Sequence, residues 1–329
     1  MKKIITLLLS LVLVAGVFSG CSGGKADSAK YSVVCTVFSE YEWTREIAAG
    51  DNDIEVKLLG GKGVDLHNYQ PTIKDVAEIS RCDMFVYVGG ISDGWTKNVL
   101  SSAENKNMRT IKLFDVLSSR LREEDEEDDN DHDHDHDHDH DHDHDHDETE
   151  YDEHLWLSLK NAVIAAEKIK DELTAMNPDK SDLYASNFAA YKQKLDALDG
   201  EYAAAVSSAK VKTLVFADRF PFRYMTEDYG IEYFAAFPGC SSQSEISPAK
   251  IMSLASKIDE KKLNCVVILS DSKEDAAKAV IEKTAGKNQK IVKLDSLQSV
   301  STKDIQNGKT YLSAMQSNLA ALKTALEAE

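Results

Sequence analysis

The stretch that decides the fold is residues 181–210, SDLYASNFAAYKQKLDALDGEYAAAVSSAK. Its large apolar residues recur at steps of three to five positions: Leu183, Phe188, Tyr191, Leu195, Leu198 and Tyr202. This spacing places them on one face of an amphipathic helix. Such a helix is long enough to run along two domains rather than inside one, and 329 residues suffice for about two domains.

On both sides of this helix, β-rich apolar runs alternate with helical segments. Before it, strands are expected at residues 31–37, 54–59, 83–88 and 110–113. After it, strands are expected at residues 213–217, 231–237, 265–269 and 291–294. Helices lie between them, one of them predicted to open with Pro71 at its first position. The alternation predicts an α/β fold with two parallel-sheet lobes joined by the long helix.

The charge of the chain is concentrated in one segment. The formal net charge is −19, from 57 acidic and 38 basic residues. Residues 123–153 hold 20 of the acids and no Lys or Arg, so the remainder of the chain is nearly neutral. Neither part offers the basic face that a general nucleic-acid binder requires. The chain also lacks a Walker A motif and a GxGxxG after a strand, which disfavours nucleotide binding.

The N-terminus is typical of an exported, lipid-anchored protein. Lys2 and Lys3 precede an apolar run of 15 residues, 4–18, which is too short to span a membrane comfortably and fits a signal peptide. The run ends in VFSGC, whose Cys21 resembles the lipidated cysteine of bacterial lipoproteins. We expect an extracytoplasmic protein held at the cell membrane by lipid on Cys21. An ordinary cleaved signal with an incidental cysteine is the alternative.

Four further cysteines carry no CxxC motif, so a cysteine-based zinc knuckle is not expected. Cys35, Cys82 and Cys265 lie in or beside apolar runs and are interpreted as buried small hydrophobic residues. A bridge between Cys240 and Cys265 is compatible with an oxidising compartment, although the sequence does not establish it.

Histidine is as unevenly distributed as charge. Eight of the ten lie in the acidic tract: His132, His134, His136, His138, His140, His142, His144 and His146. The other two are His67, in a loop between a strand and a helix, and His154, at the start of a helix after the tract. Ligands of open α/β sheets bind at such strand ends. Imidazole is a common zinc ligand, so the two isolated histidines are candidates for one metal site.

At these positions the chain resembles a known family. GVDLHNYQPT (63–72), DEHLWLSL (152–159), KLDSL (293–297) and YLSAMQSNL (311–319) are similar, in order, to motifs of the zinc/manganese substrate-binding lipoproteins of ABC transporters. The resemblance implies two (βα) lobes flanking one rigid helix, with the metal in the interlobe cleft. It implies a monomeric receptor that delivers metal to a membrane permease and its ATPase, and not an enzyme.

The resemblance also implies a ligand set. The family's first two histidines map onto His67 and His154, and its late aspartate maps onto Asp295. Where the family has a His or Glu after the first strand of the second lobe, this chain reads FADRFPFRY (216–224), and Asp218 is the nearest residue able to coordinate. A helix cap or an ion pair is the alternative role of Asp218, and Glu245 is a weaker candidate ligand.

Zinc is the expected cargo, with manganese as the alternative. Nitrogen ligands bind zinc more tightly than manganese, and the tract offers many imidazoles. The tract itself is expected to be a solvated, disordered run that captures zinc weakly near His154. A surface lipoprotein for zinc buffering or adhesion is a competing hypothesis. A zinc hydrolase is disfavoured because no HExxH motif occurs.

These assignments divide the chain into six segments. They are a signal peptide (1–20), a tether (21–30), an N-terminal lobe (31–121), an acidic His-rich loop (122–153), the end of the N-terminal lobe with the long linking helix (154–210), and a C-terminal lobe (211–329).

Overall fold

The computed structural model describes residues 29–61, 63–124, 150–241 and 245–328. The predicted signal peptide, Cys21 and the eight histidines of the tract lie outside these residues. Within the described ranges, no helix combines the length and apolar character needed to cross a membrane.

The N-terminal lobe is a parallel four-stranded sheet in the order β2-β1-β3-β4. Its strands are β1 (Tyr31–Cys35), β2 (Ile54–Leu58), β3 (Met84–Tyr87) and β4 (Arg109–Lys112). Its helices are α1 (Phe38–Ala48), α2 (Ile73–Arg81), α3 (Thr96–Ser101) and α4 (Leu113–Val116). The strands confirm the sequence prediction to within a few residues at each end.

The predicted start of α2 is wrong by two residues. Thr72, not a residue before Pro71, is the N-cap: its hydroxyl accepts from the Asp75 backbone N–H, and the Asp75 carboxylate accepts from the Thr72 backbone N–H. This reciprocal capping box satisfies two backbone donors at once and so fixes the helix start.

The C-terminal lobe repeats the same strand order, β6-β5-β7-β8, again with all strands parallel. Its strands are β5 (Thr213–Phe220), β6 (Glu232–Pro238), β7 (Cys265–Leu269) and β8 (Lys290–Leu294). Its helices are α7 (Arg223–Tyr229), α8 (Pro248–Lys261), α9 (Asp275–Lys283) and α10 (Thr302–Gln306). Strand β5 runs three residues beyond its predicted end, with a register shift against β6 between Phe216 and Arg219.

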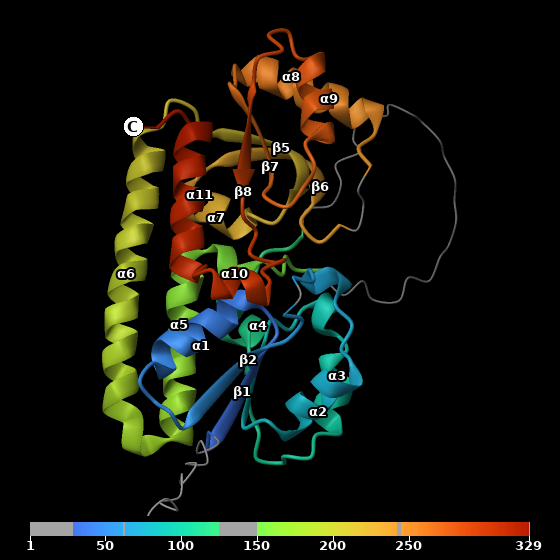
Figure 1. The fold of residues 1–329 in the computed structure, drawn as a ribbon. Coiled ribbons are helices and arrows are strands. Elements are labelled where there is room, and N and C mark those ends of the chain that lie inside the picture. The colour runs from blue at the N-terminus through green and yellow to red at the C-terminus, as the bar shows by residue number, and fades with distance from the viewer. Residues whose placement is uncertain (1–28, 62, 125–149, 242–244, 329) are drawn as a thin grey trace, which may run out of the picture.

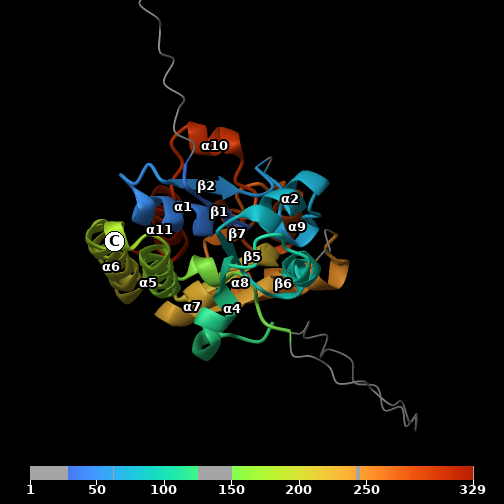
Figure 2. The same cartoon turned by 90° about the horizontal axis from the view of Figure 1, so that it is seen from below.

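Three long helices connect the lobes. They are α5 (Leu159–Met176), α6 (Ser181–Ser208) and α11 (Tyr311–Ala325). Helix α6 runs alongside both lobes, with α5 against its lower part and α11 against its upper part in Figure 1. Figure 2, seen from below, shows α5 and α6 side by side at one flank of the molecule. The predicted long linking helix is therefore confirmed.

One continuous apolar core passes from lobe to lobe. It includes Val33 of β1, Trp156, Tyr202 of α6, Phe216 of β5 and Tyr311 of α11, all fully buried. Smaller clusters lie under α8 and α9 in one lobe and under α2 and α3 in the other. Because the two sheets share this core, the segments that enter the boundary between the lobes are held in fixed positions.

Candidate metal centre

The two isolated histidines meet where the lobes face each other. His67 lies in a 3-10 turn, Leu66–Asn68, that follows β2, and Asp65 caps this turn by accepting from the His67 backbone N–H at 3.0 Å. His154 directly precedes a second 3-10 turn, Leu155–Leu157. Their Nε2 atoms are 3.1 Å apart, and the His154 side chain is fully buried.

Hydrogen bonds to the other ring nitrogens orient both imidazoles. Asp152 Oδ1 accepts from the backbone N–H of His154 at 2.7 Å and lies 3.0 Å from its Nδ1. His67 Nδ1 lies 2.7 Å from Ser92 Oγ and 3.5 Å from Glu153 Oε2. Carboxylate or hydroxyl partners at Nδ1 leave both Nε2 lone pairs facing the shared space, which is the arrangement found around metal-ligating histidines.

The pKa values of the two imidazoles are shifted in opposite directions. Burial and the neighbouring His154 lower the pKa of His67 to about 4. Burial alone would also lower the pKa of His154, but the charges of Asp152, Glu124 and Glu153 outweigh it and raise that pKa. Near neutral pH, His67 is therefore unprotonated and able to donate its lone pair.

A cysteine that the sequence analysis did not single out as a ligand lies beside this pair. His67, His154 and Cys240 each bring a ligand atom within 4.8 Å of the other two. Cys240 follows β6, and its backbone N–H donates to Glu124 Oε1 at 3.2 Å. The preceding Gly239 has no Cβ, and a Cβ there would lie 3.1 Å from the His154 ring and 2.8 Å from a backbone oxygen. Only glycine permits this close approach of the turn to the imidazole.

Polar groups from both lobes surround the histidines. Gln298 Nε2 lies 3.0 Å from His154 Nε2 and 3.3 Å from Asp65 Oδ1. Arg219 pairs with Asp65 at 3.0 Å. The residue before Gln298, Leu297, has φ of +62°, a conformation that a bulky side chain rarely adopts and that surrounding structure must enforce.

The carboxylates expected as ligands are engaged elsewhere. Asp218 accepts from the backbone N–H groups of Leu269 and Arg219, at 3.0 and 2.9 Å. It lies within the extended β5 at the register shift, and bulges of this kind redirect side chains. From the sequence, the strand was expected to end at residue 217, just before Asp218.

Asp295 also has partners of its own. Its carboxylate accepts from the Leu297 backbone N–H at 2.9 Å and pairs with Lys309. Glu245 is exposed. Among the described residues that could ligate a metal in a group of three or more, the structure brings together His67, His154 and Cys240, and not these carboxylates.

All four described cysteines are free. Cys35, Cys82 and Cys265 are buried, as expected, whereas Cys240 is partly exposed. Cys240 and Cys265 are not bridged, so Cys240 is available for other chemistry.

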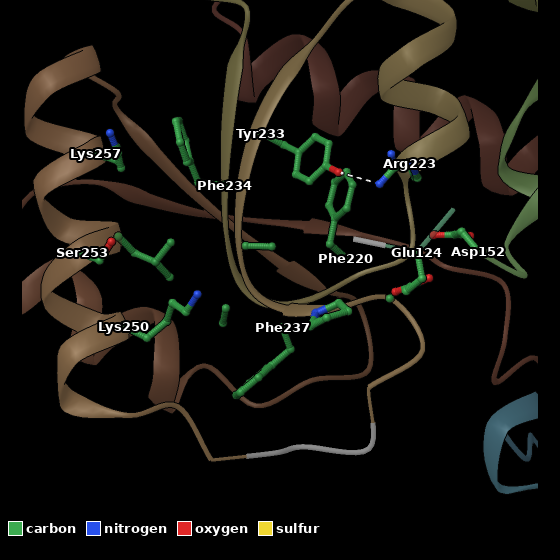
Figure 3. A pocket seen from close by; sticks show the side chains of 15 residues that line it. Glu124, Asp152, Phe220, Arg223, Tyr233, Phe234, Phe237, Lys250, Ser253 and Lys257 are labelled. Carbon is green, nitrogen blue, oxygen red and sulfur yellow. Dashed lines mark hydrogen bonds between the residues drawn. The ribbon is translucent and has the colours of Figure 1, made fainter. Parts of the chain in front are cut away.

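A cavity of about 620 Å³ in the C-terminal lobe is lined in part by Glu124, Asp152 and Gly239, which contact the candidate ligands. In Figure 3, Glu124 and Asp152 lie at one end, while Lys250, Ser253 and Lys257 of α8 lie at the other. Because Asp152 and Glu124 contact His154 and Cys240 respectively, the cavity provides space next to the candidate ligands.

Comparison with known proteins identifies the family. The model of the family described as zinc-uptake complex component A, periplasmic, matches residues 33–325. The chain belongs to this family. The family description is that of an uptake component, not of an enzyme.

Relatives of this chain support the family assignment. The zinc-binding lipoprotein AdcA of Streptococcus pneumoniae is 34% identical over 330 residues, which cover all of this chain and 62% of that protein. The chain thus spans less than two thirds of the length of this curated relative. The high-affinity zinc uptake system protein ZnuA of Bacillus subtilis is 28% identical, with 96% of this chain and 94% of that protein covered.

Solved structures resemble this chain over most of its length. The Zn(II)-bound ZnuA-like domain of S. pneumoniae AdcA matches with a TM-score of 0.68 and 30% identity, covering 90% of this chain and 99% of that domain. The two-lobed α/β architecture is therefore that of the family. The predicted family resemblance and fold class agree with this result.

The sequence alone did not reveal the residues that hold the two imidazoles in place or lie beside them as a further candidate ligand. They are Asp65, Ser92, Glu124, Asp152, Glu153, Cys240 and Gln298. One signal was present for Cys240. It is the cysteine after Cys21 that lies in no apolar run, and it follows a glycine after a predicted strand.

Proposed function

We propose that this chain is the extracytoplasmic receptor of an ABC importer, which binds zinc between its lobes through His67 and His154. The observation that supports this most directly is the 3.1 Å separation of the His67 and His154 Nε2 atoms. The Nδ1 atom of each ring already has a polar partner, so Nε2 is the nitrogen left to bind a metal. Two nitrogens bound to one tetrahedral zinc, each at about 2.05 Å, would lie about 3.3 Å apart. The ring nitrogens are thus close to the positions that zinc requires.

The transport role rests on the family and on the fold. The printed descriptions of the family and of its relatives concern zinc uptake and zinc binding. A receptor of this class would hand zinc to a membrane permease driven by an ATPase. The apolar run before Cys21 supports a lipid anchor on the outer face of the cell membrane, and we expect a monomer. Residues 132–146 would capture additional zinc weakly near His154.

A zinc titration that separates the lobe site from the tract tests the proposal. Residues 125–149 can be replaced by a short turn, because the flanking Glu123 and Tyr151 already pair as an antiparallel bridge. We expect this variant to keep one tight zinc site by calorimetry. Adding His67→Ala and His154→Ala should abolish that site.

Two results would overturn the proposal. One is tight zinc binding that survives both histidine substitutions. The other is manganese binding tighter than zinc binding, which would favour the alternative cargo. Rescue of zinc-limited growth in a strain lacking its own receptor tests delivery to the permease.

A further inference from the structure

We propose that the Cys240 thiolate is a ligand of the transported metal, so that His67, His154 and Cys240 form a two-nitrogen, one-sulfur site. This inference rests on the zinc-binding function proposed above and specifies its donor set. Thiolate takes the place of the carboxylates that the sequence led us to expect.

The Cys240 sulfur lies within 4.8 Å of the histidine ligand atoms. Zinc bound to sulfur at about 2.3 Å and to nitrogen at about 2.05 Å would bring sulfur and nitrogen to about 3.6 Å. A shift of little more than about 1 Å in the turn after β6 would close that difference.

The turn after β6 packs directly against the His154 ring. Gly239 packs so closely on the His154 ring that any Cβ would be 3.1 Å from two ring atoms. The Cys240 backbone N–H is fixed on Glu124 Oε1, and Glu124 Oε2 is buried without a hydrogen-bond partner among the described residues. Glycine and carboxylate together hold the thiol next to the imidazole pair.

The carboxylates that the C-terminal lobe could offer to the metal already have partners. Both oxygens of Asp218 accept backbone N–H groups, and Asp295 pairs with Lys309. Arg219, at the end of β5, directs a guanidinium to Asp65 at 3.0 Å. A permanent cation there disfavours a metal held from β5. Among the described His, Cys, Asp and Glu residues of this lobe, Cys240 is the one whose side-chain atom lies close to both histidines.

The donor set has a consequence for selectivity. When the metal–sulfur bond forms, the Cys240 thiol loses its proton to solvent, so one proton is released per metal from this residue. Thiolate is a soft donor that favours zinc, cobalt and cadmium, whereas manganese prefers carboxylate and water oxygens. The site should therefore discriminate against manganese more strongly than two imidazoles with two carboxylates would.

Cobalt(II) absorption tests the ligand directly, because thiolate bound to cobalt gives a charge-transfer band in the near ultraviolet and imidazole does not. The chain from Ser22 onward is titrated with Co²⁺ as it is, as Cys240→Ser, and as Cys265→Ser. Cys265 is a matched control, being a free cysteine buried against Thr324 in the same lobe. We expect the band in the unchanged chain and in C265S, and its loss in C240S.

Zinc affinity gives the second readout. C240S should bind zinc at least about tenfold more weakly, since loss of even an outer partner of a ligand costs 10- to 100-fold. A cobalt complex of the unchanged chain without the band overturns the Cys240 assignment and leaves the receptor function intact. A band that persists in C240S overturns it as well. Absence of any stoichiometric metal binding would instead refute the proposed function.

Discussion

Asp152 determines which nitrogen of His154 faces His67 and the proposed metal site. Its Oδ1 accepts from both the backbone N–H and the Nδ1–H of His154, so the imidazole presents Nε2 to His67. Gln298 Nε2 donates to the same Nε2 atom at 3.0 Å and must give way when a metal binds. The histidine pair is thus oriented by residues that do not themselves coordinate.

We predict that Asp152→Asn weakens zinc binding by about 10- to 100-fold, because the amide removes the charge that fixes the tautomer and orientation of His154. Competition with a chromophoric zinc chelator measures the change. Asp199→Asn is the matched control, since Asp199 accepts from the Tyr229 hydroxyl at 2.8 Å. Equal affinities of D152N and D199N would contradict this role of Asp152.

The residues of the site differ in how far the sequence reveals them. His67 and His154 stand out because no other histidine lies outside the tract, and both sit next to strand or helix ends. Cys240 is separated from them by at least 86 positions, and only the folding of β6 against β5 brings it near. Asp218 lies within β5, which continues past it through a register shift that the sequence pattern does not indicate.

At the scale of elements, the start of α1 buries an acid. Glu40 is fully buried; its Oε2 accepts from the backbone N–H groups of Thr36 and Val37, at 3.0 and 3.2 Å. Its Oε1 has no hydrogen-bond partner among the described residues. Burial and the charge of Asp93 raise the pKa of Glu40 to about 8. The helix start therefore favours the protonated acid.

This arrangement predicts a pH-dependent stability. Between about pH 4.5 and 8 the folded chain holds a proton on Glu40 that the unfolded chain has lost, so stability falls as the pH rises through this window. Glu40→Gln keeps the acceptor and removes the charge. We expect E40Q to melt several degrees higher than the unchanged chain at pH 9, with a smaller difference at pH 5.

Calorimetric melting at the two pH values measures this effect. Glu167→Gln on the exposed face of α5 is the control and should leave the profile unchanged. Asp93, whose pKa burial raises to about 7, keeps part of the pH dependence in E40Q. A melting temperature of E40Q below that of the unchanged chain at pH 9 would count against a destabilising charge at Glu40.

Helix α11 is tied to the opposite lobe by its first residue. The Tyr311 hydroxyl donates to the Trp156 backbone oxygen at 2.7 Å, and the Trp156 indole N–H donates to the Ser296 oxygen at 2.9 Å. Both side chains are fully buried. These two bonds fix the turn after His154 against the C-terminal lobe.

We predict that Tyr311→Phe lowers the free energy of unfolding by about 1–3 kcal/mol, because it leaves the buried Trp156 carbonyl without a partner. Chemical denaturation measures the loss. Tyr41→Phe on α1, where the ring is half-buried, should change stability by less than about 0.5 kcal/mol. A Y311F variant as stable as Y41F would show that the bond contributes nothing.

At the scale of the whole molecule, the fold follows closely from the sequence. Alternating strands and helices on both sides of one long amphipathic helix specify two parallel sheets, because parallel neighbours need crossover connections. Strand order and the shared core do not follow from such patterns. Trp156 and Tyr311 belong to different segments, and their packing depends on how the lobes meet.

The shared core limits how far the lobes can move apart. It joins strands of both sheets to α5, α6 and α11, and it includes the fully buried Trp156, Tyr202 and Tyr311. Wide opening would expose these aromatic side chains at about 25 cal/mol per Å² of apolar surface. The free energy of binding one metal through a few side chains is small compared with the cost of exposing this core. We therefore expect metal binding to move only Gln298 and the turn at Cys240.

We therefore predict that zinc leaves the overall shape unchanged. Small-angle scattering of the chain with residues 125–149 replaced by a short turn should give superimposable profiles without and with zinc. Removing the tract matters, because zinc bound to its histidines would alter the radius independently of the lobes. A change in radius of gyration beyond experimental error would mean that the lobes separate despite their common core, and that metal release works through hinge opening rather than through rearrangement at the site.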